Sequence, residues 1–278
     1  MSQGQQKVVL VTGCSKGGIG HSLCDAFAAK GCRVYASARR VEAMDGFKHA
    51  GIRRVTLDVT KDEDVKSAID FVIAEEGRID ILVNNAGTLC IGPIIDIPAE
   101  QAAQCFDTNF ISVLRMTNEV VPHMASRKHG LIVNIGSVTG EIPTPFNGMY
   151  SAAKAALHSM TDTLSLELAP LGIRTFLVSP ASVKSNIAQN HSKIFTLPPN
   201  SLYKSYLDRI IGRMYMSQKE GTYVTADVFA AQVVERALRP TPPWFWRGGG
   251  GAFKWLFLNL IPRRWALGML WNIIAGKK

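Results

Sequence analysis

At 278 residues and 47% hydrophobic content, the chain is long enough to build one large core, and a single globular body is expected. The formal net charge of +9 is unevenly distributed: residues 1–235 hold 23 basic and 22 acidic side chains, and no acidic residue follows Glu235. A nucleic-acid-binding protein would need a basic face on its folded body. The charge distribution therefore argues against nucleic acid as a partner.

The cysteines and the start of the chain bear on the cellular setting. Five cysteines are an odd number, and they show no spacing typical of metal ligands. This favours a reduced, intracellular compartment and no metal site. Residues 1–6 lack the character of a signal peptide, so we expect a cytoplasmic protein.

The first predicted element is an apolar strand at residues 7–12, followed by a glycine-rich loop and a helix from about Gly20 to Lys30. The loop reads Thr12-Gly13-Cys14-Ser15-Lys16-Gly17-Gly18-Ile19-Gly20. Glycines let the backbone approach a pyrophosphate closely, and the following helix N-terminus favours negative charge. Such a loop is also compatible with an ordinary tight turn, but its place after the first strand favours a dinucleotide cofactor.

The second predicted strand, residues 33–38, ends at Arg39 and Arg40. An acidic residue at this point typically binds the ribose of NADH, whereas an arginine accommodates the 2′-phosphate of NADPH. The sequence therefore favours NADPH, with Lys16 as a second positive charge near the phosphate. A solvated helix start remains an alternative for Arg40.

Further strands are predicted at residues 53–58, 80–84, 131–137 and 174–179, with helical segments between them. This alternation is typical of the α/β class and indicates a Rossmann-like, doubly wound parallel sheet of about seven strands.

Three polar residues lie where such a sheet binds its ligand. Ser137 closes an apolar strand, and Tyr150 and Lys154 are spaced one helical turn apart. A lysine ammonium favours the phenolate of a nearby tyrosine and would lower its pKa. The pair would then serve as an acid/base at an alcohol or ketone oxygen, with Ser137 hydrogen-bonded to that oxygen. For Tyr150 and Lys154 alone, a solvated helix face remains open.

Together these motifs resemble the short-chain dehydrogenase/reductase family over about residues 7–240. The matching residues are Thr12-Gly13, Gly18-Ile19-Gly20, Asp58-Val59, Asn84-Asn85-Ala86-Gly87, Asn109, Ser137, Tyr150 and Lys154. The resemblance implies a catalytic tetrad of Asn109, Ser137, Tyr150 and Lys154, in which Asn109 positions a water for proton relay. It also implies the cofactor-binding set Gly13, Ser15, Lys16, Gly18, Ile19, Gly20, Arg39, Asp58, Val59, Asn85, Ala86, Gly87, Tyr150, Lys154, Val183 and Ser185.

Two features depart from the common family pattern. The glycine loop is one residue longer, and the segment at 180–185 has Ala181 where the family has a glycine. Alanine adopts positive φ less readily, so the backbone near the nicotinamide is expected to differ. The longer loop and the tail most resemble the 1-acyldihydroxyacetone-phosphate reductase branch.

Residues 185–222 interrupt the sheet pattern, with a helix predicted from Asn200 to Ser217. Its apolar stripe could simply cover the core. Because the family places substrate specificity here, we expect a substrate lid.

The tail, residues 248–278, follows a first unit at 1–247 in the expected domain division. All five tryptophans and eight of the basic residues come after Glu235. The apolar blocks 252–261 and 265–275 are each too short to span a bilayer. Two interpretations remain open: contact with a membrane or lipid-droplet surface, and packing on the domain or in a homo-oligomer.

These observations predict an NADPH-dependent oxidoreductase that reduces a ketone of a hydrophobic, lipid-like substrate resembling acyl-dihydroxyacetone phosphate. One alternative is a reductase or dehydrogenase of a secondary-metabolite pathway. Another is an idle NADPH-binding scaffold, against which the complete tetrad argues. The family resemblance also implies a possible homo-oligomer.

Overall fold

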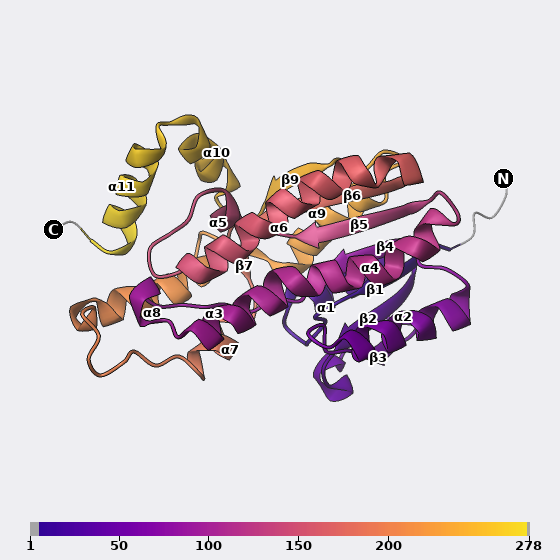
Figure 1. Ribbon diagram of the computed structural model, residues 1–278, viewed down its shortest axis with the longest axis horizontal. Coiled ribbons are helices and arrows are strands. Elements are labelled where there is room, and N and C mark those ends of the chain that lie inside the picture. Colours follow the sequence, from indigo (N-terminus) through magenta and orange to yellow (C-terminus); the bar gives the residue numbers. More distant parts are fainter. Residues whose placement is uncertain (1–5, 277–278) are drawn as a thin grey trace.

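The computed structural model describes residues 6–276, within which a seven-stranded parallel sheet forms the centre of the molecule (Figure 1). The strand order is β3-β2-β1-β4-β5-β6-β9. The strands are β1 (Val8–Val11), β2 (Arg33–Ala38), β3 (Arg53–Thr56), β4 (Ile81–Asn84), β5 (Gly130–Ile135), β6 (Ile173–Pro180) and β9 (Phe245–Gly248). The prediction of a doubly wound α/β fold of about seven strands is confirmed, and β9 is the edge strand beside β6.

Helices cover both faces of the sheet. They are α1 (Ile19–Ala29), α2 (Asp62–Glu76), α3 (Ala99–Phe106), α4 (Ser112–Ala125), α5 (Val138–Glu141), α6 (Gly148–Glu167), α7 (Ile187–Ser192), α8 (Leu207–Met214), α9 (Ala226–Ala237), α10 (Ala252–Leu260) and α11 (Arg263–Ile274). In β1, Val9 and Val11 face α1 and α9, whereas Val8 and Leu10 face α2 and α4. Burial on both faces explains why the strand is a continuous apolar run.

The direction of strand order reverses at β1, which has β2 on one side and β4 on the other. Chain connections leave β1 and β4 towards opposite faces, and the loops after these strands separate there. Such a point at the carboxyl ends of parallel strands is where open α/β sheets bind ligands.

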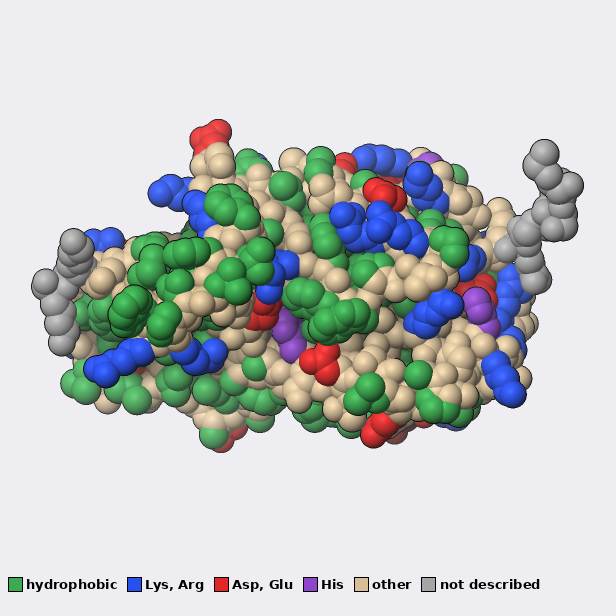
Figure 2. Space-filling view, turned by 90° about the horizontal axis from the view of Figure 1, so that it is seen from above, with side chains coloured by type: hydrophobic (Ala, Val, Ile, Leu, Met, Phe, Trp, Pro, Cys, Tyr) green, Lys and Arg blue, Asp and Glu red, His purple; other side chains and the backbone are tan. Residues whose placement is uncertain are grey.

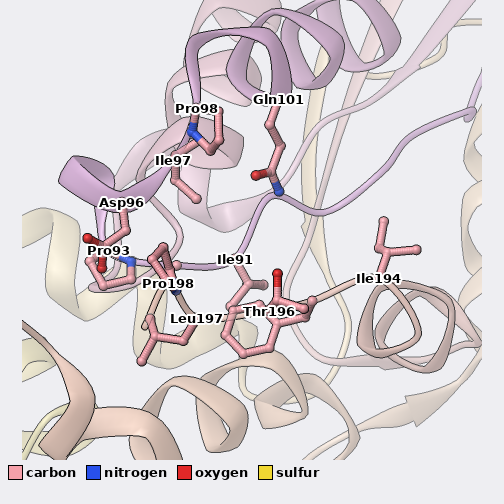
Figure 3. A pocket seen from close by; sticks show the side chains of 12 residues that line it. Ile91, Pro93, Asp96, Ile97, Pro98, Gln101, Ile194, Thr196, Leu197 and Pro198 are labelled. Atoms are coloured by element: carbon pink, nitrogen blue, oxygen red, sulfur yellow. The ribbon is translucent and has the colours of Figure 1, made fainter. Parts of the chain in front are cut away.

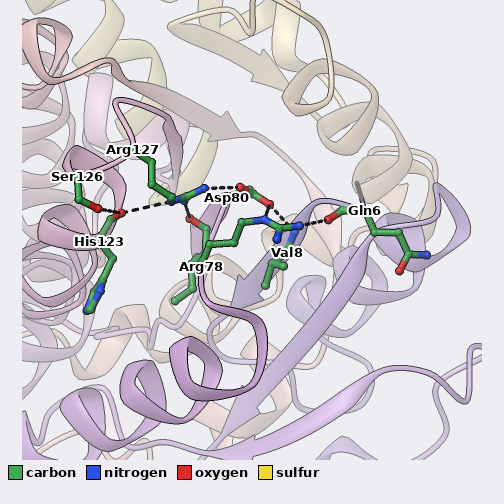
Figure 4. Close-up of polar contacts among 8 residues, drawn as sticks. Gln6, Val8, Arg78, Asp80, His123, Ser126 and Arg127 are labelled. Atoms are coloured by element: carbon green, nitrogen blue, oxygen red, sulfur yellow. Dashed lines mark hydrogen bonds and ion pairs between the residues drawn. The ribbon is translucent and has the colours of Figure 1, made fainter. Parts of the chain in front are cut away.

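At the other end of the strands, Asp80 joins the amino ends of β1 and β4 (Figure 4). Its carboxylate accepts hydrogen bonds from the Val8 backbone at 2.8 Å, Arg78 at 3.0 Å and Arg127 at 3.1 Å. Burial alone would raise the pKa of Asp80, but these donors outweigh it and lower the pKa below its usual value. The network fixes the amino ends of the strands, which are remote from the carboxyl ends where the candidate site residues lie.

The segment predicted as one helix from Asn200 to Ser217 is shorter and less regular. Only α8 is α-helical, with 3₁₀ turns at Lys204–Tyr206 and Met216–Gln218 on either side. Ser201 accounts for the late start: its hydroxyl accepts a hydrogen bond from the Tyr203 backbone at 3.0 Å and donates one to Asp96 at 2.6 Å. Such local side-chain bonding competes with helix formation.

The tail folds into α10 and α11, which match the two predicted apolar blocks, with Pro262 between them. Figure 1 shows these helices, in yellow, at the same end of the molecule as α5, α7 and α8. No helix among residues 6–276 combines the length and the apolar character needed to cross a bilayer. Residues 1–5, Lys277 and Lys278 lie outside the described residues. The expectation of no signal peptide concerns the first of these segments, and two of the basic residues of the tail are in the second.

Candidate active site

The glycine loop and the loop after β4 pack closely against each other at the point where the strand order reverses. Gly13 has φ of 72°, and a Cβ added there would lie 2.7 Å from the Ala86 Cα. At Gly20, an added Cβ would lie 2.4 Å from the Asn85 side-chain nitrogen. That nitrogen donates to the carbonyls of Thr12 at 2.8 Å and Gly13 at 3.1 Å. Larger residues at the two glycines would push these loops apart.

A third segment, Val183 to Asn186, closes over the glycine loop. Val183 and Lys184 form β7, which pairs in parallel with β8 (Val224–Thr225). The Asn186 side chain donates to the Lys16 carbonyl at 3.1 Å, and its backbone N–H donates to the Gly17 carbonyl at 3.1 Å. Sequence reasoning missed Asn186, and its only signal was its position directly after the expected contact Ser185.

The basic residues expected at a 2′-phosphate gather beside this loop. Arg39 and Arg40 follow β2 and are exposed. The Lys16 side chain runs along Gly46 of the segment that follows them. Burial would raise the pKa of Asp58, but hydrogen bonds from Thr60 and the charge of Arg39 lower it. Asp58 is therefore a carboxylate at neutral pH, close enough to Arg39 to be stabilised by its charge.

Ser137 lies two residues beyond the end of β5 and caps the short helix α5. Its hydroxyl accepts from the Thr139 backbone at 3.2 Å and lies 3.0 Å from the Thr139 hydroxyl. The Ser137 backbone N–H donates to His158 Nε2 at 3.2 Å. Burial lowers the pKa of His158 to about 4, so this imidazole is neutral and able to accept. In the structure His158 therefore positions Ser137.

Tyr150 and Lys154 both lie in α6, as their spacing predicted. The Lys154 Nζ donates to the Ile135 carbonyl at 2.8 Å and lies 5.8 Å from the centre of the Tyr150 ring. Burial raises the pKa of Tyr150 to about 12. A hydrogen bond from Ser137 and the charge of Arg213 favour the phenolate and lower this pKa, but their effect is smaller than that of burial. Burial also lowers the pKa of Lys154 to about 8. The expectation that Lys154 gives Tyr150 a lowered pKa is therefore wrong for this structure, because the cost of burying the phenolate dominates.

Asn109 is fully buried in a π-helical turn (Asp107–Ile111) between α3 and α4. Its amide nitrogen donates to the carbonyls of Thr88 at 2.9 Å and Cys105 at 2.8 Å, and its oxygen accepts from the Thr88 backbone. A Cβ added at Gly87 would lie 2.9 Å from the Asn109 oxygen and 3.8 Å from Lys154 Nζ. Gly87 thus allows Asn109 and Lys154 to approach one another.

The structure brings the predicted site residues to one edge of the sheet. Ser15 and Gly18 lie in the glycine loop, Ile19 begins α1, Val59 is buried after β3, and Ser185 follows β7. Ser137, Tyr150, Lys154 and Asn109 lie around the carboxyl end of β5 and the loop after β4. One connected edge therefore holds the glycine-rich cradle, the basic end and the polar tetrad.

The sequence profile of the short chain dehydrogenase family matches residues 7–194. An NADPH-dependent 1-acyldihydroxyacetone phosphate reductase of Schizosaccharomyces pombe is 37% identical over 229 residues, which are 81% of this chain and 76% of that protein. A short-chain dehydrogenase of Penicillium ochrochloron is 34% identical over 261 residues, 93% of this chain and 94% of its own. A crystal structure of a short-chain dehydrogenase from Streptomyces avermitilis superposes with a TM-score of 0.81 at 28% identity, covering 97% and 98% of the two chains. The protein belongs to the short-chain dehydrogenase/reductase family of oxidoreductases.

Proposed function

We propose that the protein is an NADPH-dependent reductase that converts a ketone of a hydrophobic, lipid-like substrate into the alcohol. The observation that carries this proposal is the placement of Ser137, Tyr150 and Lys154 beside the glycine-rich cradle. A protein that only bound the cofactor would not need a tyrosine and a lysine on one helical face next to a serine.

The cradle fits a dinucleotide. Added Cβ atoms at Gly13, Gly17 and Gly20 would each come within 2.7 Å of another group of the protein, so only glycine fits at these three positions of the loop. The amino end of α1 favours a pyrophosphate, and Arg39 with Lys16 would hold the 2′-phosphate. When bound, NADPH supplies the hydride. The NADPH dependence of the fission yeast relative supports this choice of cofactor.

The tetrad would handle the substrate oxygen and its proton. With a pKa of about 12, Tyr150 remains a phenol at neutral pH and can donate its proton to the oxygen of the reduced carbonyl. Ser137 would orient that oxygen, held in place by His158. Lys154 would carry a nearby positive charge that stabilises the transient tyrosinate. Asn109, fixed by Thr88 and Cys105, would position the water that returns a proton.

An apolar cluster near the tetrad supports a hydrophobic substrate. Its buried members Ile91, Phe146, Ile210 and Met214 bring together α8, the loop after β4 and the loop before α6. A cavity of about 110 Å³ adjoins it, between the loop after β4 and residues 194–198 (Figure 3). Ile91, Phe195 and Leu197 belong to both the cluster and the cavity lining. We therefore assign residues 185–222 as the substrate lid, with an acyl chain held along this surface.

The tail has one face that packs on the domain and one face that is exposed. Leu258 and Leu270 are buried against Ile142, whereas Phe253, Leu260 and Trp265 are 72%, 76% and 69% exposed. Figure 2 shows hydrophobic side chains and neighbouring Lys and Arg residues gathered on this part of the surface. We propose that the packed face completes the lid and that the exposed apolar and basic face contacts a membrane or lipid-droplet surface.

The proposed reaction is tested by following NADPH oxidation with a panel of ketones. The panel pairs a long-chain acyl-dihydroxyacetone phosphate with polycyclic and polyketide-type ketones, which represent the secondary-metabolite alternative. Tyr150→Phe should reduce kcat to a few per cent or less while NADPH affinity stays within a few fold, because only the proton donor is removed. Residual turnover well above that level would contradict the role of Tyr150, and binding of NADPH without turnover of any ketone would favour the scaffold.

A further inference from the structure

Arg213, in helix α8 of the lid, is a buried charge without an acidic partner. The residue is 8% exposed, and its Nε donates to the Thr144 hydroxyl at 2.8 Å. Among the described residues, no carboxylate lies within 4.0 Å of the guanidinium, and its two terminal nitrogens donate no hydrogen bond to the protein. Burying an arginine without a counter-charge is costly, and burial lowers its pKa to about 10. Such a cost is expected to be offset when a ligand is bound.

The position of Arg213 links it to the reaction centre. Thr144 belongs to the loop between α5, which Ser137 caps, and α6, which carries Tyr150. The positive charge of Arg213 favours the phenolate of Tyr150, and the two groups are thus close enough to interact electrostatically. On either side of Arg213 in sequence, Ile210 and Met214 belong to the apolar cluster of the lid. A fixed positive charge therefore lies near Tyr150 of the tetrad and beside the apolar cluster.

We propose that Arg213 binds an anionic group, a phosphate or a carboxylate, that the ketone substrate carries near its carbonyl. A guanidinium offers a planar pair of donors that matches two oxygens of such a group, and Thr144 would hold that plane in place through Nε. The apolar cluster would accommodate the hydrocarbon part of the same molecule. This inference rests on the proposed ketone reduction and adds the charge of the substrate to it.

The variants Arg213→Met and Arg213→Lys test this assignment in the full-length enzyme. Methionine removes the charge at similar volume, a change that buried charged sites often tolerate. Arg209→Met is the matched control, because Arg209 lies one turn earlier in α8 and is exposed. Melting temperature and NADPH affinity verify that each variant is folded.

The first measurement compares kcat/KM for a long-chain acyl-dihydroxyacetone phosphate with that for the same ketone lacking the phosphate. Loss of a charge-assisted hydrogen-bonded pair should lower the ratio about 10- to 100-fold in Arg213→Met, mainly through KM. Arg213→Lys should retain part of the ratio, and Arg209→Met should retain all of it. A long-chain 3-oxo acid in place of the phosphate ester shows whether a carboxylate serves as well. An unchanged ratio in Arg213→Met would overturn the inference while leaving the ketone reduction intact.

The second measurement does not depend on turnover. Calorimetry on the enzyme–NADP⁺ complex compares dodecyl phosphate, dodecanoate and dodecanol. Wild type should bind at least one of the two anions more tightly than the alcohol, and Arg213→Met should lose that difference. Equal affinities in wild type would overturn the anion site even if the methionine variant does not fold. An Arg213-dependent preference in an enzyme that reduces no ketone would support the site and contradict the proposed function.

Discussion

Arg39 is the residue on which the expected cofactor preference depends most directly. It follows β2 at the position where an acidic side chain would repel a 2′-phosphate, and its charge helps to lower the pKa of Asp58. Arg40 and Lys16 lie nearby and are also exposed. The structure therefore offers three positive charges and places Arg39 at the strand end itself.

We predict that Arg39→Asp raises KM for NADPH strongly and improves the use of NADH. The substitution replaces attraction at the 2′-phosphate by repulsion, and a charge-assisted contact contributes about 1.5–3 kcal/mol. Steady-state kinetics with both cofactors measure the effect, with Arg40→Asp as the neighbouring control. An unchanged NADPH/NADH preference in Arg39→Asp would mean that the phosphate is bound by Arg40 and Lys16 instead.

We predict that Lys154 makes the rate of the proposed reduction depend on pH. Burial lowers its pKa to about 8, whereas Tyr150 keeps its proton up to about pH 12. As pH rises through about 8, Lys154 loses the charge that stabilises the tyrosinate, so kcat for reduction should fall. A profile of kcat from pH 6 to 10 at saturating NADPH reveals the titration. In Lys154→Arg the residual activity should lack this step, and a wild-type rate that stays constant to pH 10 would contradict the assignment.

At the scale of secondary-structure elements, the candidate site and the Asp80 network lie at opposite ends of the strands of one sheet. Glycines and polar side chains line the carboxyl ends of the strands, whereas Asp80 joins the amino ends of β1 and β4 to the turn after α4. A buried carboxylate with three donors is inexpensive to keep ionised but costly to replace. The remote edge can therefore be tested without touching the site.

We predict that Asp80→Asn lowers the free energy of unfolding at pH 7 by about 2 kcal/mol, because the charge-assisted bonds are lost. The Asp80 pKa is lowered by folding, so its contribution is present above the unfolded pKa of about 3.9 and lost as pH falls through the folded pKa. Urea unfolding at a series of pH values from 7 downwards should show that the difference between wild type and variant shrinks below about pH 3.9 and is lost once the pH lies below the folded pKa. Asp70→Asn, which removes an exposed partner of Lys66, should leave stability unchanged. A difference that persists in acid would contradict this linkage.

Considered as a whole molecule, the protein carries several exposed large apolar side chains on the tail helices α10 and α11. The tail is anchored through Glu141, whose carboxylate accepts from Arg247, Asn259 and Ser179. Trp271 packs against Phe146, with ring centres 6.2 Å apart, so α11 reaches the apolar cluster that contains Ile210 and Met214. Removal of the tail would therefore expose this apolar cluster as well as remove the exposed face of the tail, and point substitutions separate the two effects better than truncation.

We predict that Phe253→Glu with Phe257→Glu greatly reduces sedimentation of the protein with anionic liposomes while leaving NADPH binding unchanged. Both rings are exposed in the described structure, and each would contribute about 1.5–3 kcal/mol if buried in lipid. The neighbouring basic residues would add about 1 kcal/mol each, so binding should be partly sensitive to salt. Leu202→Glu is the control, because Leu202 is an apolar residue outside the tail that is even more exposed than the two phenylalanines. Wild-type protein that stays in the supernatant at low salt would contradict the membrane contact.

The sequence by itself determined the elements whose signals are local. Continuous apolar runs predicted the buried strands, and the four-residue spacing of Tyr150 and Lys154 placed them on one turn of α6. The glycine loop after the first strand predicted the place of the cofactor cradle, because the backbone geometry there excludes most side chains. These features follow from the order of neighbouring residues, so they could be predicted without the fold.

Only the tertiary structure decided which distant residues meet and what that does to their chemistry. His158 supports Ser137, Asn186 closes the glycine loop, and Arg213 reaches Thr144 across 69 positions of sequence. The pKa of Tyr150 rises instead of falling because burial depends on everything packed around the ring. The tail also shows this dependence on tertiary structure, because its composition alone is compatible both with packing on the domain and with lipid contact. Which apolar side chains are buried is set by the partner surface that folding brings to them, and no local pattern contains that information.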